Sequence, residues 1–136
     1  MEMFRSTKYL TLEGAKKMMA AAEAEALKNK WNVAIAIVDA GGSLLMFQKL
    51  DETQSGSIDV AIGKARTAVT FKRPTKALEE IISGGRSVFL AVEGITPLQG
   101  GLPIMLEGQL LGGVGVSGVL SSQDEQVSQA ALDALR

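Results

Sequence analysis

The chain has 136 residues, of which 46% are hydrophobic and only 4% aromatic, and its formal net charge is −1. This length predicts a single domain over residues 1–136, and the charge gives no field that favours nucleic acid or an anionic membrane. The absence of His and Cys excludes Ser-His-Asp triads, Cys-His dyads, the usual zinc sites and a haem held by a proximal His or Cys.

The first half of the chain predicts a helix, a hairpin and a second helix. Small apolar residues recur at intervals of three and four over residues 12–26, with Thr11 as the N-cap. Residues 33–39 are apolar on both faces, which is typical of a covered central strand, and residues 43–50 predict its hairpin partner. A helical period follows over residues 58–69.

The second half predicts one helix, three strands and a final helix. The helix covers residues 75–85, the strands cover 87–92, 102–106 and 109–117, and the last helix, with a capping box at its start, covers 121–135. Hairpins at both ends of the chain favour the α+β class over a doubly wound sheet.

The stretch from Gly113 to Gly118 spells G-x-G-x-x-G, the glycine pattern of a dinucleotide-binding turn. That turn belongs to a unit in which a helix and then a second parallel strand follow, and the sequence from Gly118 to Arg136 is too short for that strand. Gly113 and Gly115 share one strand face. We therefore expect these glycines to allow close packing of a helix or a second subunit, with contact to a ligand as the alternative.

Between residues 60 and 78 the chain carries five cations and no acid, which suits one anionic ligand better than nucleic acid. Lys64 lies off the apolar stripe of its helix, so it is either a solvated lysine or an anion contact in a pocket. The five cations are Lys64, Arg66, Lys72, Arg73 and Lys76.

The segment GITPLQGGLPI, residues 94–104, combines two prolines with three glycines. A rigid path with exposed amides at Gly100 and Gly101 would cradle a carboxylate or phosphate, and Thr96 would add a hydroxyl. The alternative is a rigid crossover or a subunit contact. Asp124 is interpreted as a cap residue of the last helix rather than a catalytic acid.

Four blocks in fixed order resemble the GlcG/HbpS-like family, also described as haem-degrading-like, which includes the C-terminal domain of some PduO-type proteins. The resemblance runs from about Thr11 to Leu135. It implies a profilin-like α+β domain with a five-stranded, mainly antiparallel sheet flanked by helices, and a homo-oligomer. The blocks are IVDAGGSLLMFQKLD, IGKARTAVTF, ITPLQGGLPIMLEGQLLGGVGVSG and SSQDEQVSQAAL.

Several positions match motifs of that family. Lys64 matches its K-A step, Gly100 and Gly101 its G-G-x-P loop, and Ser117 its G-V-S-G block, while Asp51 lies in an acidic loop after the second strand. Lys49 departs from the family's usual Arg, and members that ligate haem through His have no counterpart here. The predicted ligand-binding residues are Lys64, Asp51, Thr96, Gly100, Gly101 and Ser117, in a pocket where residues 94–101 meet the second helix.

These features predict a small-ligand-binding protein that binds a small organic anion or a haem-like tetrapyrrole and is accessory to a catabolic or cofactor pathway. Haem remains a cofactor implied by the resemblance alone. One alternative is a small lyase or isomerase that acts on an organic acid through Lys64 and Asp51; another is a structural oligomer subunit without a ligand. We predict no metal site, and we expect a cytoplasmic protein because no apolar run reaches the ~20 residues of a membrane span and no secretory signal is recognised.

Overall fold

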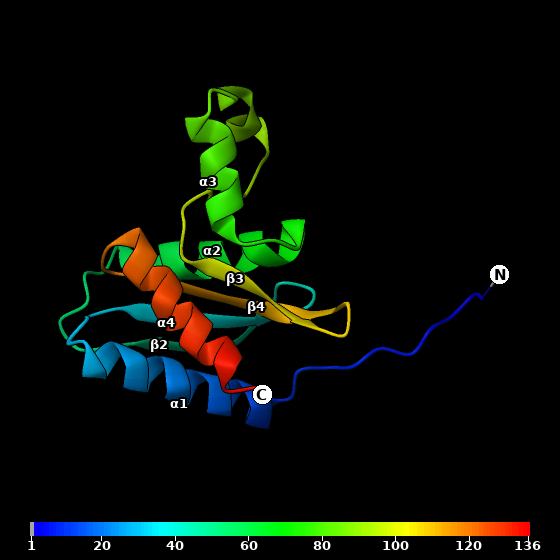
Figure 1. The fold of residues 1–136 in the computed structure, drawn as a ribbon, viewed down its shortest axis with the longest axis horizontal. Coiled ribbons are helices and arrows are strands. Elements are labelled where there is room, and N and C mark those ends of the chain that lie inside the picture. Colours follow the sequence, from blue (N-terminus) through cyan, green and yellow to red (C-terminus); the bar gives the residue numbers. More distant parts are fainter. Residues whose placement is uncertain (1) are drawn as a thin grey trace.

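A computed structural model describes residues 2–136 (Figure 1). An antiparallel sheet lies between α1 and α4 on one face and α2 on the other, and α3 projects away from these layers. The elements are α1 (Leu12–Lys28), β1 (Ala34–Asp39), β2 (Leu44–Lys49), α2 (Ser57–Phe71), α3 (Thr75–Ser83), the 3-10 helix η1 (Ser87–Ala91), β3 (Gly101–Leu106), β4 (Gln109–Ser117) and α4 (Ser121–Asp133).

The strand order is β2-β1-β4-β3, so the two central strands come from distant parts of the chain. All five residues 34–38 of β1 are buried, as its double apolar pattern predicts. Ile35 and Ile37 belong to the core beneath α1 and α4, whereas Ala34, Ala36 and Val38 belong to the core beneath α2. The isoleucine face of β1 therefore fills the core beneath α1 and α4 with large side chains, whereas the opposite, mostly alanine face lets α2 approach closely.

The predicted α+β class and the helices are confirmed, but the sheet has four strands rather than five. The predicted strand at residues 87–92 is wrong, because residues 87–91 form η1. Its hydrogen bonds are local: the Phe89 N–H donates to the Arg86 carbonyl and the Val92 N–H donates to the Phe89 carbonyl, both at 3.2 Å. A β-branched, apolar pattern favours a strand only where a partner strand lies alongside, and this segment has none.

The two predicted helix starts have different outcomes. Thr11 is the N-cap of α1, and its hydroxyl accepts a 3.0 Å hydrogen bond from the Gly14 N–H. The predicted serine capping box of α4 is wrong, because Leu120 is the N-cap and Ser121 is already helical. Only the Gln123 side chain reaches back, accepting from the Leu120 N–H at 3.3 Å.

Residues 75–98 form a projecting arm that contains α3, η1 and the segment returning to the sheet (Figure 1). Thr75 and Leu78 are the buried residues of its two helices. Its base is fixed by the Thr75 hydroxyl, which donates to the Leu98 carbonyl and accepts from the Gly101 N–H. The Phe71 and Phe89 rings pack with centroids 5.6 Å apart. Beyond this base, the arm has little core of its own.

Within residues 2–136, no helix is long and apolar enough to cross a membrane.

Candidate functional site

Lys64 lies at the centre of a buried polar cluster that joins α2, β4 and α4. Its Nζ donates to the Val116 carbonyl at 2.9 Å and to Asp124 Oδ2 at 3.1 Å. The side chains of Lys64 and Asp124 are each only 3% exposed. An ion pair withdrawn from water in this way stabilises a fold only when its hydrogen bonds are satisfied, and it is costly to break. Lys64 is therefore not a solvated lysine.

Asp124 completes this cluster from the first turn of α4. Its Oδ1 accepts a 3.1 Å hydrogen bond from the Val119 N–H, so both carboxylate oxygens have donors. Burial raises the pKa of the Asp124 carboxyl above its usual value, although the Lys64 charge and the Val119 N–H act in the opposite direction. Asp124 fixes the backbone just before α4, as a cap-like residue would, and in addition neutralises Lys64.

Gly100 closes the cluster from the side of the predicted ligand loop. Its φ is +135°, and a Cβ there would lie 2.7 Å from Lys64 Nζ and 2.9 Å from the Val116 carbonyl oxygen. The Gly100 carbonyl accepts from the Ser128 hydroxyl at 2.6 Å. Only glycine lets the loop approach the ammonium group this closely. The glycine loop thus covers Lys64 rather than opening a pocket above it.

Two of the other predicted loop residues have backbone N–H groups that are already bonded within the fold. The Gly101 N–H donates to the Thr75 hydroxyl at 2.8 Å, and the Thr96 N–H donates to the Thr67 hydroxyl at 2.9 Å. Ser117 is buried at the end of β4. Neither Lys64 nor Gly100 lines any of the four clefts at Glu125, Asp51, Arg66 and Ile104. An anion pocket at Lys64 stays a prediction, and it would require the loop to move.

Asp51 is not brought together with Lys64. It is exposed in the loop after β2 and lines a cleft of about 480 Å³ with Asn32, Gln48 and Glu52. Lys64, by contrast, is buried between the sheet, α4 and the loop. A catalytic pair formed by these two side chains therefore has no geometric support.

The G-x-G-x-x-G stretch serves helix packing, as the sequence predicts. A Cβ at Gly113 would lie 2.5 Å from the Ala65 carbonyl oxygen, and a Cβ at Gly115 would overlap the Ala61 carbonyl oxygen. Both glycines are buried in β4 beneath α2. The backbone of α2 consequently packs directly on the backbone of β4. This close packing is the reason that Lys64, which lies on α2, is buried.

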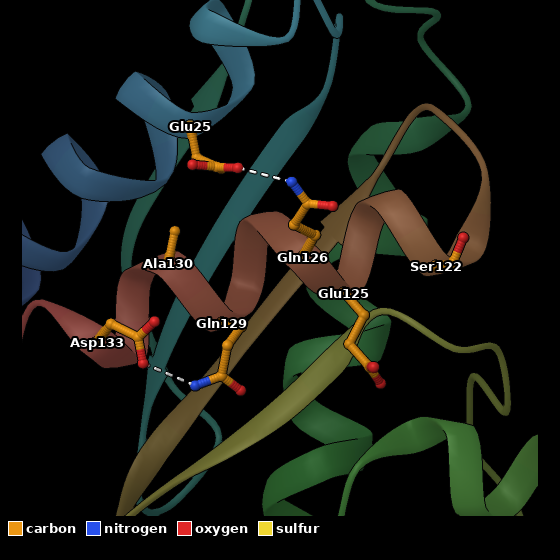
Figure 2. Close-up of a pocket in the computed structure, with 7 residues that line it drawn as sticks. All are labelled: Glu25, Ser122, Glu125, Gln126, Gln129, Ala130 and Asp133. Atoms are coloured by element: carbon orange, nitrogen blue, oxygen red, sulfur yellow. Dashed lines mark hydrogen bonds between the residues drawn. The ribbon is translucent and has the colours of Figure 1, made fainter.

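A shallow groove of about 380 Å³ lies between α1 and α4 (Figure 2). Gln126 Nε2 donates to Glu25 Oε2 at 2.7 Å across the two helices, and Gln129 Nε2 donates to Asp133 Oδ1 at 2.9 Å. The bond from Gln126 is the main cause that lowers the pKa of Glu25. No sequence pattern indicated this groove, because its residues come from helix surfaces 101 positions apart.

Across residues 2–136, no group of three His, Cys, Asp or Glu side chains is arranged to hold a metal ion.

The family model, the sequence relatives and the solved structures that match this chain agree on one family. Residues 10–133 match the family model described as haem degrading protein HbpS-like. Protein GlcG of Escherichia coli (strain K12) is 40% identical over 108 residues, which cover 79% of this chain and 81% of that protein. A crystal structure of a double mutant of Streptomyces reticuli HbpS has a TM-score of 0.90 at 32% identity, covering 98% of this chain and 91% of that one. The crystal structure of a PduOC:heme complex has a TM-score of 0.87 at 27% identity, covering 93% of this chain and 95% of that one.

Proposed function

The chain belongs to the HbpS-like family of haem-degrading proteins, and from this premise we propose that it binds a small organic ligand as a homo-oligomer. The ligand class we favour is a tetrapyrrole or another flat organic acid, held against the projecting arm. The relative in the PduOC:heme complex supports this class. A cytoplasmic location and an accessory role in a catabolic or cofactor pathway remain part of the same proposal.

The apolar surface of the arm is the observation that carries the proposal. Val88 is 68% exposed, Leu90 57%, Leu98 43% and Val92 40%. Apolar area left in water costs about 25 cal/mol per Å², so a projecting segment with this composition gains free energy when it is covered. A flat ligand, a second copy of the chain, or both together would cover it.

The available donor groups determine whether the residues of this chain fit haem itself. The chain has no His and no Cys, and the arm of residues 75–98 contains no Met or Tyr either. The arm supplies apolar contacts, and the exposed Arg86 has no carboxylate within 4 Å among residues 2–136, so it is free to pair with an acid group. These residues fit the organic part of a tetrapyrrole and do not fit a His- or Cys-ligated iron, so we propose no chemistry at the metal.

The alternative functions have less support. A lyase or isomerase working through Lys64 and Asp51 would need two residues that lie in separate environments, one buried in an ion pair and one exposed. A purely structural subunit would explain the apolar arm without a ligand. A titration with porphyrins distinguishes this alternative from a ligand-binding protein.

The test is a titration of the purified protein with hemin and, separately, with metal-free protoporphyrin, followed by absorbance. We expect the two dissociation constants to agree within about threefold, because the iron gains no His or Cys ligand. Leu90→Asp in the arm should weaken both by roughly tenfold or more, since it places a charge on the apolar surface. Leu27→Asp on α1, at a residue that is 61% exposed and outside the arm, is the matched control.

Three outcomes would contradict the proposal. If the protein binds neither porphyrin, the structural alternative is favoured. If Leu90→Asp and Leu27→Asp lose affinity equally, the arm is not part of the binding site. Sedimentation as a 14.3 kDa monomer at micromolar concentration would remove the oligomer.

A further inference from the structure

The cations between residues 60 and 78 do not act together, because the structure gives them different partners. Lys64 is used by Asp124, and Lys76 Nζ lies 3.9 Å from Glu80 Oε1. Arg66 and Lys72 are exposed, and neither has a carboxylate within 4 Å among residues 2–136. Arg73 likewise has no carboxylate within 4 Å among the described residues, so three of the five positive charges are left without an internal counter-ion. Two of these, Arg66 and Lys72, lie at the same place.

That place is a cleft of about 420 Å³ between the end of α2 and the turn that joins β1 to β2. Arg66 and Lys72 line it from α2, Gly41 and Gly42 line it from the turn, and Leu110 lines it from β4. Arg66 Nε donates to the Gly42 carbonyl at 3.0 Å, which fixes the guanidinium against the turn. The Nη donors of Arg66 have no hydrogen-bond partner within residues 2–136.

Lys72 adds a second, independent feature. It ends α2 with a φ of +53°, a left-handed conformation that is unfavourable for residues other than Gly, Asn and Asp. Its own N–H caps the helix by donating to the Ala68 and Val69 carbonyls. A glycine would cap this helix with less strain, so the lysine side chain has a role that the cap does not require.

The negative groups near the cleft are largely occupied. Asp39 is the carboxylate of the turn, and its Oδ1 accepts from the Gly41 and Ser43 N–H groups at 2.9 Å each. The last carbonyls of α2, which carry the negative end of the helix dipole, are bonded by the Lys72 N–H. The two cations thus outnumber the one carboxylate of the turn.

From this geometry we infer that the cleft binds a small organic carboxylate, with Arg66 and Lys72 as its charged contacts. The planar guanidinium matches a carboxylate in two-point geometry, and Lys72 supplies a point charge. The side chains of Val69 and Leu110 form apolar walls, which favour an organic acid over inorganic phosphate. The cleft is lined by no residue of the arm, so this site goes beyond the proposed function and is tested independently of it.

The experiment is an NMR titration of the isotopically labelled protein at low ionic strength with succinate as the probe. We expect saturable shifts of the Gly41 and Gly42 amides. Arg66→Gln should weaken binding roughly tenfold or more, and Lys72→Asn, which tolerates the left-handed conformation, should weaken it by about three- to tenfold. Lys76→Gln removes the same charge outside the cleft, so we expect a change of less than about twofold.

Inorganic phosphate and sodium chloride form the other two arms of the titration. Phosphate that binds as tightly as succinate would overturn the organic carboxylate, and chloride that causes the same shifts would overturn a specific site. Equal affinities for the Lys72→Asn and Lys76→Gln variants, or shifts that map to another surface, would also overturn the inference. Unchanged amide dispersion in each variant establishes that the comparison is made between folded proteins.

Discussion

The body of the protein, meaning the sheet with α1, α2 and α4, contrasts with the arm of residues 75–98. In the body, a helix backbone touches a strand backbone at Gly115, and the Lys64–Asp124 ion pair is almost fully withdrawn from water. In the arm, the two helices bury only Thr75 and Leu78. The difference indicates that the interior of the body determines stability, whereas the arm and the surface cleft at Arg66 and Lys72 remain available for binding.

The largest expected effect comes from removing one partner of the buried ion pair in the body. Lys64→Met leaves the Asp124 carboxylate buried without its counter-ion, so we expect a loss of about 3–5 kcal/mol in the free energy of unfolding. Adding Asp124→Asn should recover part of this loss, because Asn is neutral and still accepts from the Val119 N–H. Urea unfolding of the three proteins measures both values. Lys28→Met removes an exposed lysine whose Nζ lies 3.9 Å from Glu25 Oε1; it is the control and should change stability by less than about 1 kcal/mol. A double variant that is no more stable than Lys64→Met alone would contradict the coupling.

The next effect concerns the contact between α2 and β4. Gly115→Ala places a methyl group where the Ala61 carbonyl oxygen lies, so we expect overpacking to cost about 1–3 kcal/mol. Gly56→Ala is the matched control, because a Cβ there meets no atom within 4 Å and φ is −60°. Its stability should change by less than about 1 kcal/mol. Equal thermal midpoints for the two variants would show that α2 moves away from the sheet at little cost.

The smallest effect lies on the surface of the body, in the groove of Figure 2. Because Gln126 lowers the pKa of Glu25, the folded state binds this proton less tightly than the unfolded chain does. The contribution is present above the unfolded pKa and is lost as the pH falls through the folded pKa. Gln126→Leu should therefore cost about 0.5–1.5 kcal/mol at pH 7 and less in strong acid. A loss that is constant from pH 7 to pH 3 would contradict this linkage.

Local patterns predicted most of the fold. The helical periods, the double apolar pattern of residues 33–39 and the turn at residues 107–108 depend on neighbours in sequence, and the structure confirms them. The small face of β1 and the glycines of β4 correctly predicted a closely packed helix. The segment 87–92 was wrong because its composition resembles a strand, and composition does not reveal that no partner strand lies beside it.

The candidate site was predictable only in part, because it depends on long-range pairing. Lys64 was recognised by its place off the apolar stripe, and Asp124 by its place at the start of α4. Their ion pair joins residues 60 positions apart, which no spacing rule indicates. The distribution of the remaining cations, with Arg66 at the Gly42 turn, likewise follows from the way α2 lies on the sheet.

The strand order β2-β1-β4-β3 has a consequence for how the chain folds. The β1–β2 and β3–β4 hairpins are local, but β1 pairs with β4 through contacts such as Ile35 with Val116, which close a very long loop. Folding rates fall as contacts become more distant in sequence, so this central pairing is expected to be the slow step. Until it occurs, an emerging β1–β2 hairpin presents an apolar strand edge to its surroundings. During synthesis, that edge is the part of the nascent chain we expect a chaperone to protect.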